Sequence, residues 1–202
     1  MNTECSGTPR VVLIERHKRI EPDIEKSELA GLNCELITVA VNDEDDVIRA
    51  VAGADVVLDS SLPMPVSVIK TLNRCGLIVR LGHGYENVDI QAATAAGIMV
   101  ANTAGATSEE VSSHAMALML SCARRLHLLN KGIREGRWNE LWSRDACSQI
   151  WGETLGIMGF GHIGRAIARK ANVFRMNVIA YDPFIGPWID LEENVSQVSF
   201  NE

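Results

Sequence analysis

Short runs of aliphatic and β-branched residues recur along the first hundred positions, separated by segments whose apolar residues repeat with a helical period. Such runs, bounded by Gly, Asn, Asp and Pro, are typical of strands in a parallel sheet whose crossovers are helices. The predicted strands are Val11–Ile14, Glu35–Val39, Ala54–Asp59, Leu77–Leu81 and Ile98–Ala101. The pattern therefore predicts one small α/β domain over residues 1–105.

The sequence indicates where two of the helices begin and end. Asn42 is placed to cap a helix that ends at Gly53, and the acidic run after Asn42 suits the first turn of that helix. The segment from Thr107 to about Gly136 lacks Pro and repeats apolar residues with helical spacing, and Thr107 with Glu110 gives a capping-box pattern. A single helix of this length would measure roughly 40 Å. We therefore expect it to open a second domain, over residues 106–202.

Composition narrows the class of protein. The chain has 202 residues, of which 47% are hydrophobic and 22% charged, and a formal net charge of −7. The acidic balance argues against coating nucleic acids, and the longest apolar run, Ala115–Leu120, is too short for a membrane helix. Five cysteines without a Cys-x-x-Cys pair favour free thiols in a reducing cytoplasm and predict no metal site. We expect a cytoplasmic protein with neither a nucleic-acid nor a membrane partner.

The strongest chemical signal is a G-x-G-x-x-G motif that starts at Gly159. It lies between a predicted strand, Leu155–Met158, and a predicted helix. A further strand, Val178–Tyr181, leads into Asp182. Strand, glycine-rich turn, helix, strand and acid in this order are the fingerprint of a dinucleotide-binding fold.

Each glycine of the motif has a physical task. Gly159 permits the tight turn, Gly161 leaves room for a pyrophosphate, and Gly164 lets helix and strand pack closely. The helix start then offers backbone N–H groups to the phosphates. The candidate cofactor-binding residues of this turn are Gly159, Phe160, Gly161, His162, Ile163 and Gly164.

Asp182 bears on the choice of cofactor. At this position a carboxylate accepts hydrogen bonds from the adenosine ribose, although a cap or turn role before Pro183 is the alternative. A carboxylate also repels the 2′-phosphate of NADP, and no Lys or Arg follows Arg175. The sequence favours NAD.

A second glycine loop follows the predicted strand that ends near Arg80. Ligands of open α/β sheets bind at such strand ends, and Gly82 and Gly84 on either side of His83 could present N–H groups to an anion. Arg80 and His83 are candidates to meet a carboxylate or phosphate. The residues alone are equally compatible with an alternative in which this segment is only a tight turn and Arg80 forms an ion pair.

These motifs resemble, in order along residues 11–202, those of the D-isomer-specific 2-hydroxyacid dehydrogenases. The shared stretches are Arg80–Asp89, Ala92–Ala93, Gly97–Ile98, Asn102–Ala106, Glu110–Val111, Arg124–Arg125, Gly136–Trp138, Gly152–Gly156, Gly159–Gly164 and Tyr181–Pro183. The resemblance implies a flavodoxin-like substrate domain and the first part of a Rossmann-like NAD-binding domain, joined by long helices. It also implies that Gly82, His83 and Gly84 contact a substrate carboxylate, and that Val111 borders the cofactor. His83 stands where the family commonly has a small residue or Val.

The implied function is an NAD-dependent oxidoreductase that interconverts a small D-2-hydroxy acid and a 2-keto acid. The family's catalytic Arg, Glu and His would lie beyond Glu202, because after Leu155 there is room only for strand, helix, strand and a third strand near Val195–Phe200. We therefore expect a truncated copy without turnover of its own. The long helix resembles the family's dimerisation segment and implies a homodimer for the parent protein. The alternatives are an NAD-responsive, corepressor-like binding module of the same fold and a non-functional remnant.

Overall fold

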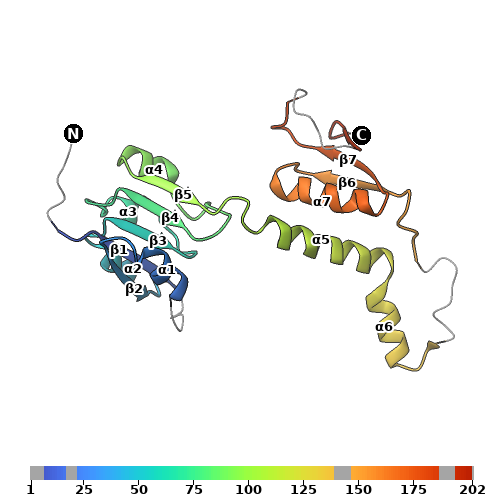
Figure 1. Ribbon diagram of the computed structural model, residues 1–202, viewed down its shortest axis with the longest axis horizontal. Helices are drawn as coiled ribbons and strands as arrows, with labels where there is room; N and C mark the ends of the chain where they lie inside the picture. The colour runs from blue at the N-terminus through green and yellow to red at the C-terminus, as the bar shows by residue number, and fades with distance from the viewer. Residues whose placement is uncertain (1–6, 17–21, 139–146, 187–193, 202) are drawn as a thin grey trace. The chain divides into compact units, whose positions relative to one another are not determined.

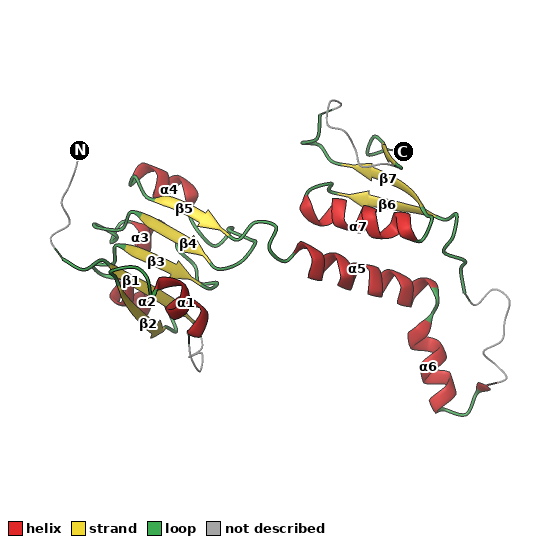
Figure 2. Cartoon of the chain, viewed as in Figure 1, coloured by secondary structure: helices red, strands yellow, loops and turns green. Residues whose placement is uncertain are grey.

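The computed structural model describes residues 7–16, 22–138, 147–186 and 194–201. The chain divides into two compact units, Met1–Ala104 and Gly105–Glu202. Each unit contains its own parallel sheet. Figures 1 and 2 show the helices and strands of each unit.

The first unit is a five-stranded parallel sheet crossed by helices. Its elements are β1 Arg10–Glu15, α1 Asp23–Leu29, β2 Glu35–Ala40, α2 Glu44–Val51, β3 Val56–Asp59, α3 Val66–Ile69, β4 Leu77–Arg80, α4 Ile90–Ala95 and β5 Met99–Asn102. The strand order β2-β1-β3-β4-β5 is that of flavodoxin-like folds and confirms the expected α/β class.

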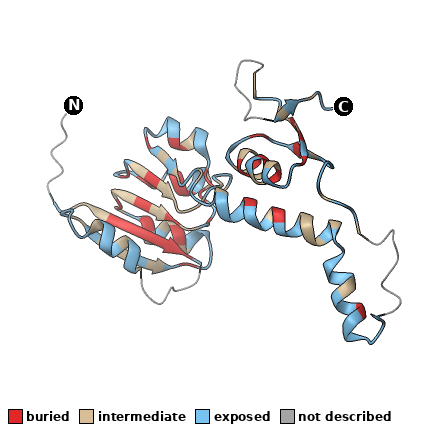
Figure 3. Ribbon diagram, turned by 45° about the vertical axis from the view of Figure 1, so that its right-hand side comes forward, coloured by how far each residue is buried: buried red, intermediate tan, exposed pale blue. Residues whose placement is uncertain are grey.

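The core of the first unit lies on its central strands, as the burial colouring of Figure 3 makes visible. Val12, Leu13 and Ile14 are fully buried, although successive side chains of a strand point to opposite faces. A strand buried on both faces has helices over each, which explains why its sequence is a continuous apolar run rather than an alternating one. The strand runs noticed in the sequence have this physical origin.

The second unit contains the consecutive helices α5 and α6, the helix α7 and a smaller sheet. Its elements are α5 Ser108–Ala123, α6 Leu126–Arg134, β6 Thr154–Met158, α7 His162–Val173, β7 Asn177–Tyr181 and β8 Val195–Gln197. The sheet is parallel, with the order β6-β7-β8. Met116 of α5, Ala168 of α7 and Val178 of β7 meet in its core. Strand, helix and strand thus follow in the order that the sequence predicts.

The prediction of one helix over residues 107–136 is wrong, because the helix breaks at Arg125. This residue has a φ of 49° and lies between α5 and α6. The carbonyl groups at the end of α5 are bonded elsewhere: Ala123 O accepts from Ser148 N at 3.0 Å, and Arg124 O accepts from Cys147 Sγ at 3.3 Å. Because these donors lie more than twenty residues away in the sequence, no local pattern could indicate the break.

Two predicted helix caps also differ. Thr107 is the N-cap of α5, but its side chain makes no capping hydrogen bond, so the capping box is absent. For α2 the cap is Asp43 rather than Asn42, since Asp43 Oδ1 accepts from Asp46 N at 2.8 Å. Asn42 instead donates through its backbone N–H to Asp46 Oδ2 at 3.1 Å. A one-residue shift of the helix start exchanges the two roles.

Within the described residues, no helix is both long and apolar enough to cross a membrane.

Candidate functional site

The glycine-rich turn joins β6 to α7 in the second unit. Gly159 has a φ of 91°, a backbone conformation that residues other than glycine rarely adopt. Its N–H donates to Tyr181 O at 2.8 Å, which ties the start of the turn to the end of β7. The turn is therefore fixed against the two strand ends that flank the candidate site.

Gly164 allows α7 to approach this turn. A β-carbon on Gly164 would lie 2.2 Å from the carbonyl oxygen of Gly159 and 3.3 Å from Ile157 Cγ2 of β6. The first of these distances is far inside van der Waals contact, and the atom involved is backbone. The close packing of α7 against β6, which the motif predicts, therefore requires glycine at position 164, because glycine has no β-carbon.

The first turn of α7 presents backbone N–H groups. Gly161 is the N-cap and supplies no side-chain acceptor, and a β-carbon built on Gly161 would meet nothing within 4 Å. The first N–H groups of a helix lack intrahelical partners and carry its positive dipole end, which together favour an anion. His162 and Ile163 are the first two residues of α7, and the His162 ring lies beside Gly105.

Asp182 braces the turn. Its Oδ2 accepts from Phe160 N at 2.7 Å, and its Oδ1 accepts from Phe184 N at 2.8 Å. These N–H groups, with that of Phe184 contributing most, hold the pKa of the Asp182 carboxyl below its ordinary value. The carboxylate thus lies next to the glycine-rich turn at the end of β7, in its ionised form.

The Phe160 side chain anchors the turn in the hydrophobic core of the second unit. Its ring is buried in the core of the second unit, 4.9 Å from the Arg165 guanidinium carbon, and its N–H is bonded to Asp182. Its side chain therefore supports the shape of the turn, and a direct contact with a cofactor stays a prediction.

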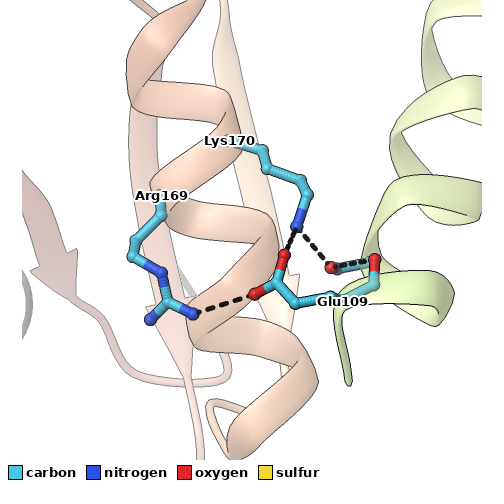
Figure 4. A network of polar contacts seen from close by, with 4 residues as sticks. Glu109, Arg169 and Lys170 are labelled. Carbon is cyan, nitrogen blue, oxygen red and sulfur yellow. Dashed lines mark hydrogen bonds and ion pairs between the residues drawn. The ribbon is translucent and has the colours of Figure 1, made fainter. Parts of the chain in front are cut away.

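Val111 lies on α5, which is bound to α7 by a polar network. Glu109 of α5 accepts from Lys170 Nζ at 2.5 Å and pairs with Arg169 at 3.4 Å, as Figure 4 shows. Lys170 Nζ also lies 2.7 Å from the hydroxyl of the buried Ser112. This network fixes the first two turns of α5 beside α7. Val111 itself is largely exposed, and its predicted contact with the cofactor is untested.

In the first unit, the loop after β4 carries the other candidate residues. The Arg80 guanidinium lies against Gly82, since a β-carbon there would be 1.7 Å from Arg80 Nη1. Arg80 Nε is buried, and no described residue accepts a hydrogen bond from it. The loop carbonyls are bonded to β5 and the residue after it, because His83 O accepts from Asn102 Nδ2 at 2.7 Å and Gly82 O accepts from Thr103 N at 3.1 Å.

Sequence reasoning missed the residues that hold this loop. Asp59, fully buried at the end of β3, accepts from Asn87 Nδ2 at 2.6 Å and from Leu62 N at 2.8 Å. Burial raises the pKa of the Asp59 carboxyl, against the opposite effect of these hydrogen bonds and of the charge on Arg80. The available signal was positional: Asp59 ends a predicted strand, and Asp59, Arg80 and Asn102 are register neighbours across β3, β4 and β5.

The strand order, the glycine-rich turn and the adjoining carboxylate define an α/β protein with a dinucleotide-binding half. Comparison with known proteins gives the family. Residues 116–202 match the domain described as "D-isomer specific 2-hydroxyacid dehydrogenase, NAD binding domain". The chain belongs to the D-isomer-specific 2-hydroxyacid dehydrogenase family.

Individual relatives agree with this assignment. A hydroxypyruvate reductase of Thermotoga maritima is 36% identical over 70% of this chain and 46% of its own length. Among solved structures, a glyoxylate reductase from Paecilomyes thermophila is 26% identical with a TM-score of 0.81, over 96% of this chain and 61% of that one. An NAD+-bound 3-phosphoglycerate dehydrogenase of Entamoeba histolytica is 27% identical with a TM-score of 0.71, over 95% and 57%. This chain therefore spans less than two thirds of each of these relatives.

The approach of α7 to the turn gives a first prediction. Gly164→Ala should lower the free energy of unfolding of the second unit by about 1–3 kcal/mol, because the backbone has to shift to admit the β-carbon. Gly161→Ala is the matched control and should lower it by less than about 1 kcal/mol, since the space around Gly161 is open and only its N-cap position disfavours Ala. Chemical denaturation followed by circular dichroism measures both. If the denaturation midpoint of Gly164→Ala equals that of the wild type, the close packing of α7 against Gly159 is contradicted.

The brace at Asp182 gives a pH-dependent prediction. The folded pKa is below the ordinary value of 3.8, so the brace stabilises the fold above that pH and is lost as the pH falls through the folded pKa. In an NMR pH titration, the amide signals of Phe160 and Phe184 should therefore move together with a midpoint below 3.8. Asp182→Asn should remove this titration. A shared midpoint above 3.8 would show that the carboxylate is not held by these N–H groups.

Proposed function

We propose that these residues belong to an NAD-dependent oxidoreductase that acts on the CH–OH group of a D-2-hydroxy acid and, in reverse, reduces a 2-keto acid. The observation that carries this proposal is the glycine-rich turn braced by Asp182, inside a segment that matches the family's NAD-binding domain. When bound, the nicotinamide ring of the cofactor would carry the hydride.

The residues around the turn fit a dinucleotide. The open space at Gly161 leaves room for a pyrophosphate, which would take hydrogen bonds from the first N–H groups of α7 at His162 and Ile163. Asp182 would bind the adenosine ribose, because a carboxylate offers about four lone-pair sites and its backbone hydrogen bonds, from Phe160, Phe184 and Ile185, do not fill them all. Its negative charge favours NAD over NADP.

The remaining assignments extend the proposal to the first unit. Residues 1–105 would form the N-terminal part of the substrate domain, and residues 106–202 the NAD-binding part. Arg80 and the loop Gly82–His83–Gly84 would bind the carboxylate of a small 2-hydroxy or 2-keto acid. The buried Nε of Arg80, which has no acceptor among the described residues, supports an anionic ligand, since an oxyanion would supply an acceptor. The free thiols of the described cysteines 34, 75, 122 and 147 support a cytoplasmic location.

A homodimer is part of the same proposal. The helices α5 and α6 carry apolar residues that are about half exposed, and these are Val111, Leu118, Leu126, Leu128 and Ile133. An apolar surface of this kind marks an interface, and a second copy of the same helices is a self-complementary partner. Ile133→Asp should therefore reduce the fraction of dimer in sedimentation velocity, whereas Lys131→Ala, on the same helix, should not. A wild-type chain that is a monomer at all accessible concentrations would refute the dimer.

Cofactor binding tests the main proposal. We expect NAD to bind at least about tenfold more tightly than NADP, because the 2′-phosphate would lie close to Asp182. Gly161→Ala should weaken NAD binding by about tenfold or more through its added β-carbon, without loss of fold. Gly76→Ala is the matched control, since its surroundings are equally open and it lies in the first unit. Calorimetric titration measures all of these, and equal NAD affinities of wild type and Gly161→Ala would refute the assignment.

Turnover is assayed with the gene product as the organism makes it. NADH oxidation with glyoxylate, hydroxypyruvate or pyruvate should give the D-configured product where that product is chiral. NAD binding that promotes dimers without any hydride transfer would instead favour the corepressor-like module.

A further inference from the structure

The loop Gly82–His83–Gly84 is flanked by two opposite charges. The Arg80 guanidinium lies against Gly82, as described above. On the other side, a β-carbon at Gly84 would be 2.6 Å from Glu86 Oε2 and 3.6 Å from the Glu86 carboxyl carbon. The two glycines therefore each have a charged side chain packed against the α-carbon, one positive and one negative.

The Glu86 carboxylate is exposed to solvent and has no compensating partner among the described residues, with which it makes neither a hydrogen bond nor an ion pair. The neighbouring acidic group, Asp59, differs in this respect, because it is buried and bonded to Leu62 and Asn87. Glu86 thus contributes a full negative charge, with unused acceptor sites, to the surface of the loop.

This arrangement sets the charge of a ligand that fits the loop. One carboxylate can pair with Arg80, whose guanidinium is a fork-shaped donor suited to it. A second negative group on the same small molecule would lie within a few ångströms of Glu86, and the loop carries no Lys or second Arg to offset the repulsion. A hydroxyl group at that place would instead donate a hydrogen bond to the carboxylate.

We propose that Glu86 is a specificity-determining residue that selects hydroxy acids with a single carboxylate and rejects those with a second anionic group. The inference rests on the proposed function, because it takes the loop as the site of the substrate carboxylate. Its preferred ligands are small, singly charged acids whose remaining substituents are neutral hydrogen-bond donors.

Two nearly isosteric probes separate the alternatives. D-glycerate carries a hydroxymethyl group where tartronate carries a second carboxylate, and the rest of the two molecules is the same. The affinity of each is measured from the backbone amide signals of residues 82–84 in NMR titrations of the chain at constant ionic strength. In the wild type, glycerate should bind about fivefold more tightly than tartronate, the effect of one charge pair at about 4 Å in water.

Variants assign the preference to the side chain. Glu86→Gln keeps the size of the side chain and should reduce the preference for glycerate over tartronate to less than about twofold, chiefly because tartronate binds more tightly. Glu28→Gln is the matched control for net charge, because it changes an exposed acid on α1, which precedes the opposite edge strand β2. It should leave the wild-type ratio unchanged.

The outcomes that overturn the proposal are specific. A ratio unchanged in Glu86→Gln, or equal changes in Glu86→Gln and Glu28→Gln, would show that Glu86 does not set the selection. If neither probe shifts the signals of residues 82–84, the loop is not a carboxylate site and the inference fails. Titration with NAD, followed at residues 159–164 of the second unit, tests the cofactor assignment separately, so failure of one is distinguishable from failure of the other.

Discussion

The contact between Gly164 and the Gly159 carbonyl is the constraint on which the candidate cofactor site depends. Because α7 approaches the turn more closely than a β-carbon would allow, the helix start, the end of β6 and the end of β7 come together in one place. The pairing of Met158 with Tyr181, continued by the hydrogen bond from Gly159 N to Tyr181 O, brings Phe160 N within 2.7 Å of Asp182. The carboxylate and the N–H groups of α7 therefore have fixed positions before any ligand arrives, and a pre-organised site loses less free energy to ordering when it binds.

The two units use the same physical device at their parallel strand ends. In each, a strand leads into a glycine loop, and an aspartate accepts the backbone or side-chain N–H groups that hold the loop: Asp182 in the second unit and Asp59 in the first. The environments push the two pKa values in opposite directions. Asp182 is only partly buried and its hydrogen bonds dominate, which lowers its pKa, whereas desolvation dominates at the buried Asp59 and raises it. The first carboxylate stays available to a ligand, while the second is committed to the fold.

The sequence predicted what depends on local pattern and missed what depends on distant partners. All the predicted apolar and β-branched runs are strands, and the most continuous of them, Val11–Ile14, lies in β1, which is buried on both faces. The break at Arg125 was not predictable, since the donors that bond the end of α5 come from Cys147 and Ser148. The glycine motif specified the turn, but nothing local indicates that Asp59 and Asn87 meet across 28 residues. The position of the Glu86 carboxylate against Gly84 is likewise a matter of side-chain placement, which no motif encodes.

The two units differ in how completely they cover their sheets. The central strand β1 of the first is buried on both faces, and the side chains of the unit's helices pack into the same core. In the second, Met158 of β6 is 82% exposed and Phe200 is 70% exposed, besides the apolar side chains of α5 and α6. Parallel sheets are found with both faces covered, since open apolar strands lose the free energy of burial. The described apolar side chains of the second unit, which carries the glycine-rich turn, are therefore less completely buried than those of the first, which carries the loop Gly82–His83–Gly84.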